Sequence, residues 1–179
     1  MRIIGGIYKN RRLDFKNLNI RPTTNFAKEG LFNILNNYYD LEAINALDLF
    51  AGSGNISYEF ASRRCQTITA VENNMKCVSF IKKIKEKLQI NNLEIKLSKV
   101  NSYLNQTESK YNIIFLDPPY HYKQVQYDQI INVIFSKKII AESGTIVIEH
   151  SKFINFEHYP IFLNKKYGRV HFSFIKNEN

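Results

Sequence analysis

Short apolar runs alternate with helix-like segments from residue 46 onward, and this alternation most strongly limits what the chain can fold into. Runs of this kind predict strands, here at residues 45–50, 67–72, 93–97, 112–117 and 145–149. Repeated strand-then-helix order is typical of βα units, which build a mostly parallel sheet. We therefore predict an α/β domain that binds its ligands at the carboxyl ends of the strands.

The segments between the predicted strands carry their apolar residues on one side. After the second strand these residues are Cys77, Ile81, Ile84 and Leu88, and after the fourth they are Tyr127, Ile130, Ile131 and Ile134. Steps of three and four residues place each set on one face of a helix. We interpret both faces as surfaces that pack against the sheet.

The end of the chain departs from the βα pattern. Residues 159–163 and 169–175 are rich in β-forming side chains and flank a short connection that contains Gly168. Two such runs around a short connection predict an antiparallel hairpin. The expected architecture is therefore a seven-stranded, mostly parallel sheet that ends in an antiparallel pair.

The first residues predict a separate small element. Residues 1–15 alternate β-branched and polar side chains around two glycines, which favours a strand or hairpin arm. We assign residues 1–20 to this arm and residues 21–179 to a single domain, because no linker-like stretch divides the chain. Residues 21–39 predict a helix with Thr23 or Thr24 as its N-cap, and its expected apolar face consists of Ala27, Leu31, Ile34, Leu35 and Tyr38.

The charge of the chain points to a polyanionic partner. The formal net charge is +9, and the first thirty residues contain seven basic and two acidic side chains, more than half of that excess. Four of these cations are arginines at positions 2, 11, 12 and 21, which a general enrichment in lysine does not explain. A basic segment of this kind is expected to contact nucleic-acid phosphates.

Several other features of the sequence indicate the cellular location of the protein and whether it binds a metal. The chain contains no apolar run long enough to span a membrane, and its first residues lack the apolar core of a secretion signal. We expect a cytoplasmic protein, monomeric and without a membrane partner. Cys65 and Cys77 lack metal-ligand spacing, so we interpret them as buried reduced thiols, and the four histidines predict no metal site.

A glycine loop follows the first predicted strand in the stretch LDLFAGSGNIS, residues 47–57. Gly52 and Gly54 allow a tight turn and a close approach of a ligand to the start of a helix, although an isolated pair of this kind is often only a structural turn. Glu72 ends the next strand, where a carboxylate can accept hydrogen bonds from ribose hydroxyls. Both features together predict a nucleoside site.

The carboxylate of Asp48 decides between cofactors. It stands beside the glycine loop, where it would repel a pyrophosphate but attract a cationic amino-acid group. The third glycine expected for a dinucleotide site is replaced by Ser57. S-adenosylmethionine therefore fits this loop, and a nicotinamide dinucleotide fits it poorly.

The fourth predicted strand runs into the sequence DPPY, residues 117–120. Proline has a fixed φ and no N–H, so Pro118 and Pro119 give a rigid turn whose carbonyl oxygens we expect to be free acceptors. Asp117 adds a carboxylate acceptor and Tyr120 adds a flat face. Such a cluster can hold the exocyclic amine of a nucleobase and stack on its ring. The simpler interpretation is a proline turn with a surface tyrosine.

These motifs together resemble the RsmD family, the bacterial 16S ribosomal RNA guanine-N2 methyltransferases that modify guanine 966. The resemblance is carried by MRIIGGIYKNRRL, RPTTNFAKEGLFNIL, LDLFAGSGNIS, VENN and FLDPPY, which span nearly the whole chain. The glycine loop is common to many methyltransferases, whereas the basic arm joined to RPTT is specific. The resemblance implies a Rossmann-like class I methyltransferase fold that uses S-adenosylmethionine.

The resemblance also implies roles for individual residues. Those that would bind the cofactor are Asp48, Ala51, Gly52, Gly54 and Glu72. Those that would bind the target guanine are Asp117, Pro118 and Tyr120. Those that would contact RNA phosphates are Arg2, Lys9, Arg11, Arg12 and Arg21. Thr23 and Thr24 either place the first helix near the cofactor or only cap it.

The chain departs from the family at one position. Relatives carry an acid after the third strand that meets the adenine amino group, whereas this chain has Lys99 there, with Asn101 two residues further. An ammonium group cannot accept a hydrogen bond. Either Asn101 or a main-chain group replaces the acid, or the affinity for the cofactor is reduced.

Two alternatives to a 16S ribosomal RNA enzyme are compatible with the motifs. The first is another amino methyltransferase, acting on adenine N6 or on a different RNA guanine, because the transfer chemistry is the same. The second is a catalytically silent RNA-binding assembly factor, which the intact DPPY sequence argues against. Both naked 16S RNA and the 30S particle are compatible partners.

Overall fold

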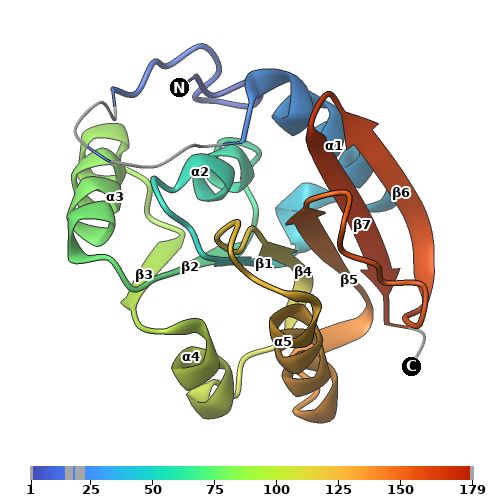
Figure 1. Ribbon diagram of the computed structural model, residues 1–179. Helices are drawn as coiled ribbons and strands as arrows, with labels where there is room; N and C mark the ends of the chain where they lie inside the picture. The colour runs from blue at the N-terminus through green and yellow to red at the C-terminus, as the bar shows by residue number, and fades with distance from the viewer. Residues whose placement is uncertain (1, 15–17, 19–22, 178–179) are drawn as a thin grey trace.

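A seven-stranded sheet with the order β3-β2-β1-β4-β5-β7-β6 forms the centre of the protein (Figure 1). The computed structural model describes residues 2–14, 18 and 23–177. The strands are β1 (Asn45–Leu49), β2 (Thr67–Glu72), β3 (Leu93–Leu97), β4 (Tyr111–Leu116), β5 (Ile140–His150), β6 (Ile161–Tyr167) and β7 (Val170–Lys176). The α-helices are α1 (Asn25–Tyr38), α2 (Asn55–Ser62), α3 (Met75–Leu88), α4 (Val100–Gln106) and α5 (Gln124–Ser136), and a short 3-10 helix, η1, covers Leu41–Ala43.

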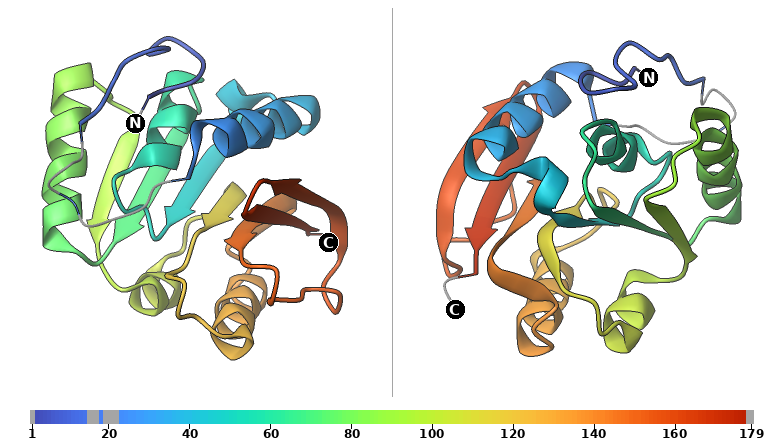
Figure 2. Two further views of the ribbon diagram at one scale, coloured as in Figure 1. Left: turned by 45° about the horizontal axis from the view of Figure 1, so that its top comes forward. Right: turned by 180° about the vertical axis from the view of Figure 1, so that it is seen from behind.

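Strands β1 to β5 pair in parallel, and β5, β7 and β6 pair in antiparallel fashion. This arrangement confirms the predicted fold class, including the C-terminal hairpin. Helices α1, α2 and α3 cover one face of the sheet, and α4 and α5 cover the other (Figures 1 and 2). Burial on both faces explains why the parallel strands are nearly continuous apolar runs. The predicted packing faces of α3 and α5 lie in these two layers.

Strand β5 is longer than its sequence predicts. It begins at Ile140, but its pairing with β4 shifts register between the contact at Tyr111 and the contact at Ile113. The intervening segment contains Glu142, Ser143 and Gly144, so its polar composition conceals the first part of the strand. Only the apolar stretch after the shift carries a recognisable strand pattern.

The described part of the predicted arm folds back on itself through one antiparallel bridge between Arg2 and Arg12. Its side chains Ile3 and Leu13 are buried in the core on the α2 side of the sheet. The main-chain N–H of Ile7 donates to Ser62 O of α2 at 2.7 Å. The arm therefore forms a turn docked on α2, without a regular strand among its described residues.

The first helix has its predicted orientation apart from Tyr38, since the other predicted residues lie in the core or pack against it: Ala27, Leu31, Ile34 and Leu35. Thr24 is the N-cap, and its hydroxyl accepts a hydrogen bond from the N–H of Ala27 at 3.2 Å. Tyr38, predicted to face the core, is 58% exposed and instead packs its ring against Phe162 of β6. The charged residue Lys28 is fully buried.

Two further expectations concern cysteines and membrane contact. Cys65 and Cys77 are buried and form no disulfide, as predicted. None of the helices in the described part of the chain is long and apolar enough to cross a lipid bilayer.

Candidate active site

Four carboxylates meet at the carboxyl edge of the sheet because strand geometry places them on one face. Side chains alternate between the two faces of a strand, and paired residues of parallel strands share a face. Asp48 pairs with Ala70 and Phe115, so Glu72 and Asp117 lie one pleat further on that face. Leu116 pairs with Ile148, which places Glu149 beside Asp117 in the same way.

The glycine loop between β1 and α2 is held in a tight turn. Gly52 and Gly54 have φ values of 54° and 78°, a region that suits glycine, and the Gly54 N–H donates to Ala51 O at 2.7 Å. Phe50 also has a positive φ, 65°, which is uncommon for an aromatic residue. Strained backbone beside a helix N-terminus is a frequent property of ligand-binding loops.

Asp48 stabilises this loop by accepting hydrogen bonds from the start of α2. Its Oδ2 atom accepts hydrogen bonds from Ser57 N at 3.0 Å and from Ser57 Oγ at 2.5 Å. Ser57, which replaces the third glycine of a dinucleotide site, is therefore a hydrogen-bond donor to the Asp48 carboxylate. Burial raises the pKa of Asp48 to about 7, against the lowering effect of the Ser57 hydrogen bonds, and the charge of Glu72 raises it further.

Glu72 connects the loop with the start of α3. Its Oε2 atom accepts a hydrogen bond from Gly52 N at 2.8 Å, and its Oε1 atom accepts from Asn73 N and Asn74 N, each at 2.8 Å. A carboxylate offers about four acceptor positions, so three are used within the protein. The remaining one suits a single ribose hydroxyl, whereas two hydroxyls would require the Gly52 bond to open.

These residues surround a cleft of about 720 Å³. Its walls include the predicted cofactor residues Asp48, Ala51, Gly52 and Glu72, together with the whole DPPY sequence, whereas Gly54 is not among its lining residues. The structure thus brings together two motifs that lie more than sixty positions apart in the chain. A second pocket, of about 310 Å³, adjoins the cleft and shares Phe50, Glu72, Asn73 and Tyr122 with it.

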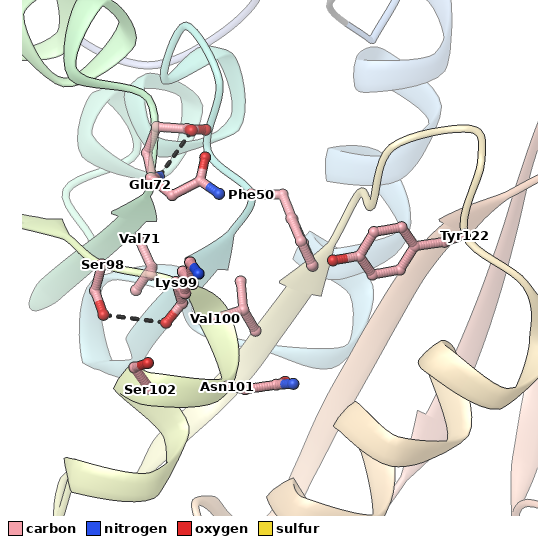
Figure 3. A pocket seen from close by; sticks show the side chains of 10 residues that line it. Phe50, Val71, Glu72, Ser98, Lys99, Val100, Asn101, Ser102 and Tyr122 are labelled. Atoms are coloured by element: carbon pink, nitrogen blue, oxygen red, sulfur yellow. Dashed lines mark hydrogen bonds between the residues drawn. The ribbon is translucent and has the colours of Figure 1, made fainter.

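The second pocket contains the position where the chain departs from the family that it resembles. Residues Ser98 to Ser102, from the end of β3 and the start of α4, line one side, and Phe50 and Tyr122 lie side by side across from them (Figure 3). Asn101 reaches from α4 toward the side that holds Tyr122 (Figure 3). Both Lys99 and Asn101 line this pocket, and only Asn101 offers a side-chain acceptor.

The DPPY turn differs in one respect from its prediction. Pro118 is buried and Pro119 is exposed, but the Pro119 carbonyl accepts a hydrogen bond from Tyr122 N at 2.9 Å, so it is not a free acceptor. This bond closes the turn and brings Tyr122 against Phe50, with 5.5 Å between ring centroids. Tyr120 is 78% exposed and presents its ring at the mouth of the cleft.

Asp117 lines the same cleft and is partly exposed to it. Burial, followed by the charges of Glu149 and Asp48, raises the pKa of Asp117 well above its ordinary value. A carboxylate in this environment gains from any donor that approaches it. Among the described residues, no group of three or more acidic, histidine or cysteine side chains could hold a metal ion.

A buried network connects the cleft with the arm, and no pattern in the sequence predicts it. The Lys28 ammonium donates to Glu59 Oε1 at 2.8 Å, to Asn55 Oδ1 at 2.8 Å and to Arg2 O at 2.6 Å. Glu59 Oε1 also accepts from Ile4 N at 2.8 Å. The side chains of Lys28 and Glu59 are both fully buried. Their spacing in the sequence carries no helical signal, because the pair joins two helices.

The same network reaches the DPPY side of the cleft through Thr23. Asn55 Nδ2 donates to Thr23 O at 3.0 Å, and Thr23 Oγ1 donates to Glu149 Oε2 at 2.7 Å. Thr24 caps α1, whereas Thr23 lines the cleft. The capping interpretation is thus confirmed for Thr24, and the placement of the first helix near the cofactor stays a prediction.

The predicted phosphate contacts lie outside the cleft. Arg2, Lys9, Arg11 and Arg12 are exposed, and Arg21 is not among the described residues. A groove of about 600 Å³ passes between the arm and the end of α3, and Arg11, Arg12 and Lys87 are among its lining residues. The basic surface of the arm therefore extends onto the end of α3.

Comparison with known proteins shows the family of the chain. The family model "Conserved hypothetical protein 95" matches residues 1–176. The chain is 40% identical to the ribosomal RNA small subunit methyltransferase D of Buchnera aphidicola from Acyrthosiphon pisum, over 84% of this chain and 78% of that protein. It is 33% identical to the protein of the same name from the Baizongia pistaciae strain, over 100% and 93%.

Solved structures show the same fold. The Escherichia coli protein yhhF superposes with a TM-score of 0.85 at 28% identity, over 99% of this chain and 98% of that chain. A Thermus thermophilus 16S rRNA N2 G1207 methyltransferase in complex with AdoMet and guanosine gives a TM-score of 0.71 at 19% identity, over 89% and 45%. From the family model, the close relatives and the shared fold, we conclude that the chain belongs to the ribosomal RNA small subunit methyltransferase D family, RsmD.

Proposed function

We propose that this protein transfers a methyl group from S-adenosylmethionine to the exocyclic N2 of a guanine in 16S ribosomal RNA. The observation that carries the proposal is the single cleft shared by the glycine loop, Glu72 and the DPPY turn. Relatives of the chain are named ribosomal RNA small subunit methyltransferase D. The proposed partner is the 16S RNA or the 30S particle, bound by a monomer in the cytoplasm.

The residues of the cleft fit S-adenosylmethionine. Gly54 has no Cβ to crowd the loop, since one would lie 2.8 Å from Cζ of Tyr58, and the buried carboxylate of Asp48 provides negative charge beneath a cationic group. Glu72 keeps one acceptor position for a ribose hydroxyl, and Ala51 lines the cleft between them. When bound there, the cofactor supplies an electrophilic methyl group on a sulfonium centre.

The second pocket provides a place for the adenine ring. Phe50 and Tyr122 offer apolar faces, and the Asn101 amide oxygen offers an acceptor for the adenine amino group. We propose that Asn101 replaces the acid that this chain lacks at Lys99. Main-chain N–H groups of this pocket would donate hydrogen bonds to the nitrogen atoms of the adenine ring, which are acceptors.

Asp117 and Pro118 act on the target amine. An amino nitrogen conjugated with a purine ring is a weak nucleophile, because its lone pair is delocalised into the ring. Acceptors that hold its N–H groups, here the Asp117 carboxylate and the Pro118 carbonyl, favour a more pyramidal nitrogen and stabilise the positive charge that develops during transfer. Asp117 is also placed to take the proton that leaves the methylated nitrogen. Tyr120 stacks on the base and keeps it in line with the cleft.

The arm provides the RNA contacts outside the cleft. The exposed side chains of Arg2, Lys9, Arg11 and Arg12 are proposed to meet phosphates, and Arg21 joins them by its place in the sequence. Because the arm is docked on α2 through hydrogen bonds, its cations keep a fixed position relative to the cleft. This arrangement suits a structured RNA partner.

A labelling assay tests the proposal. The purified protein is incubated with S-[methyl-³H]adenosylmethionine and with 30S particles, naked 16S RNA or duplex DNA from cells that lack the enzyme, and the labelled nucleoside is identified. We expect N2-methylguanosine at one site in RNA. Label in N6-methyladenine would identify the alternative amino methyltransferase, and cofactor and RNA binding without any label would identify a silent assembly factor.

A further inference from the structure

A third cavity of about 150 Å³ lies on the far side of Asp117 from the glycine loop. It shares Thr23, Asp117, Pro118, Tyr120 and Tyr122 with the main cleft. Its other lining residues come from the α1 N-cap, the end of β5, α5 and the turn before β7, and include Glu149, His150 and Arg169. A base that places its exocyclic amine at Asp117 therefore has the rest of its edge facing this cavity.

Glu149 occupies a fixed position in the cavity. Strand pairing sets it beside Asp117 on the same face of the sheet, since Leu116 pairs with Ile148. Thr23 Oγ1 donates to its Oε2 atom at 2.7 Å and so orients the carboxylate. The charge of Glu149 is close enough to Asp117 to be one of the causes that raise the pKa of Asp117. Two neighbouring carboxylates are stable together when donors approach both of them.

The edge of guanine carries two adjacent donors and one acceptor, at N2–H, N1–H and O6. Adenine instead presents an acceptor at N1, which would face a carboxylate without a proton between them. A site built to accept a hydrogen bond from a substrate N–H rejects analogues that lack it, because its buried polar groups are left unpaired. With N2 bound at Asp117, the adjacent N1–H donor of guanine lies on the side of the Glu149 carboxylate. The Arg169 guanidinium can then donate to O6.

We propose that Glu149 is a specificity-determining residue that accepts a hydrogen bond from N1–H of the target guanine, with Thr23 as its positioning residue. This inference rests on the proposed function, since it assigns the base-reading role within the same site. It explains why a threonine hydroxyl at the start of α1 is directed to the end of β5, 126 positions away.

The test compares two bases that carry the same reactive amine. 2,6-Diaminopurine keeps the exocyclic N2 amine of guanine but has an acceptor at N1. Reconstituted 30S particles are prepared with guanine or with 2,6-diaminopurine at the methylated position of 16S RNA, and kcat/KM is measured for each. The wild-type protein should prefer guanine strongly.

Glu149→Gln should lower kcat/KM for guanine by about ten- to a hundredfold, the usual effect of losing a hydrogen bond to a charged group, because Thr23 Oγ1 would hold the amide oxygen and turn the amide NH2 group toward N1–H. It should change kcat/KM for 2,6-diaminopurine by less than about threefold, because the Gln amide can donate to N1. The preference ratio therefore falls by at least about tenfold. Glu142→Gln is the matched control, since Glu142 is an exposed carboxylate near the other end of β5 and should leave the ratio unchanged.

An equal loss on both bases would show that Glu149 acts only structurally and would overturn the inference. Thr23→Val provides a second test if Glu149→Gln does not fold, because it keeps the carboxylate and removes only its orienting hydrogen bond. It should also reduce the preference for guanine, and an unchanged ratio would count against the proposal. If the wild-type protein forms no N2-methylguanosine, the proposed function itself fails, whereas an unchanged ratio with an active enzyme defeats this inference alone.

Discussion

Asp48 holds its proton more tightly in the folded protein than in the unfolded chain. Its pKa rises from an ordinary value of about 4 to about 7 because the side chain is buried. Between about pH 4 and pH 7 the native state therefore binds more protons than the unfolded state, and stability falls as the pH rises through this window. A shift of about three units corresponds to roughly 4 kcal/mol across the window.

Asp48→Asn is expected to remove that share of the pH dependence. The amide cannot ionise, so the free energy of unfolding of the variant should fall less between about pH 4 and pH 7 than that of the wild-type protein. Urea denaturation at a series of pH values measures the difference. Parallel curves for the two proteins would show that Asp48 is not the titrating group.

The ionisation of Asp117 should determine the acidic limb of the pH profile of kcat/KM. Its raised pKa means that the carboxylate form, which accepts the amine N–H, is reached only as the pH rises, so kcat/KM should increase with pH on that limb. Asp117→Ala should reduce transfer by about a hundredfold or more while leaving cofactor affinity largely unchanged. Single-turnover assays and equilibrium dialysis separate the two effects. A parallel loss of cofactor binding would contradict the assignment of Asp117 to the target amine.

Residues at the ends of recognisable strands could be predicted, and those that depend on tertiary contacts could not. Asp48, Glu72 and Asp117 each follow an apolar run, so their arrival at one edge follows from the parallel sheet. Glu149 also ends a strand, but its partnership with Asp117 requires the β4–β5 register and that with Thr23 requires the position of α1. The free Pro119 carbonyl was wrongly predicted because the Tyr122 N–H closes the turn.

At the scale of elements, the buried pair of Lys28 and Glu59 joins α1, α2 and the arm. Removing one member of a buried ion pair usually costs about 3–5 kcal/mol. Here Glu59 would keep one partner, since its Oε2 atom also accepts a hydrogen bond from Arg63 Nη1 at 2.5 Å, so the lower end of that range is expected. Lys28→Met should therefore destabilise the protein by that order, and Lys28→Met with Glu59→Gln should cost clearly less than the sum of the single changes. Denaturant unfolding of the four proteins measures the coupling. Additive costs would mean that the two side chains do not depend on each other.

The docking of the arm on α2 depends on Gly6. This glycine has a φ of 75°, and a Cβ built on it would lie 1.8 Å from Ser62 O, part of the α2 backbone. Gly168 has a φ of 62° but nothing within 4 Å of such a Cβ. Gly168→Ala should thus cost only about 1 kcal/mol of backbone strain, whereas Gly6→Ala should also release the arm.

Limited proteolysis reports on the release directly. Cleavage within the first fourteen residues should be faster in Gly6→Ala than in Gly168→Ala or the wild-type protein, and methyl transfer to RNA should fall with it. Equal cleavage rates in the two variants would show that the arm tolerates the added methyl group. The sequence predicted an arm here, but its attachment through Ser62 and Lys28 depends on the packing of three segments.

At the scale of the molecule, the net charge of +9 predicts RNA binding that weakens with salt. Each neutralised phosphate contributes about 0.7 to the slope of log affinity against log salt for single-stranded RNA. Arg11→Gln with Arg12→Gln should therefore reduce the slope by about 1.4 if each side chain meets one phosphate. Filter binding to 16S RNA at several salt concentrations gives the slopes.

Lys110→Gln with Lys138→Gln is the charge-matched control. Both lysines are exposed near the amino ends of β4 and β5, at the edge of the sheet opposite to the cleft. The double change removes the same charge as the arginine pair and should leave the slope nearly unaltered. Equal reductions would show that net charge, and not the arm, determines the salt dependence.

The fold class was predictable from the sequence because apolar periodicity reports burial on the two faces of a sheet. Tyr38 and the start of β5 were predicted wrongly, since an aromatic residue at helical spacing can pack on a strand edge and polar residues can occupy a bulged strand. The buried Lys28 also escaped prediction, because charge alone normally indicates the surface.

The strand order has a consequence for the synthesis of the protein. Strand β7, at residues 170–176, inserts between β5 and β6, so one edge of β5 has no partner in the sheet until these residues have been synthesised. Unpaired strand edges pair readily with other chains, so the nascent protein exposes an aggregation-prone edge at that stage. The cavity beside Asp117 also lacks Arg169 and Val170 until then. An incomplete chain can therefore form its glycine loop well before it can select a base.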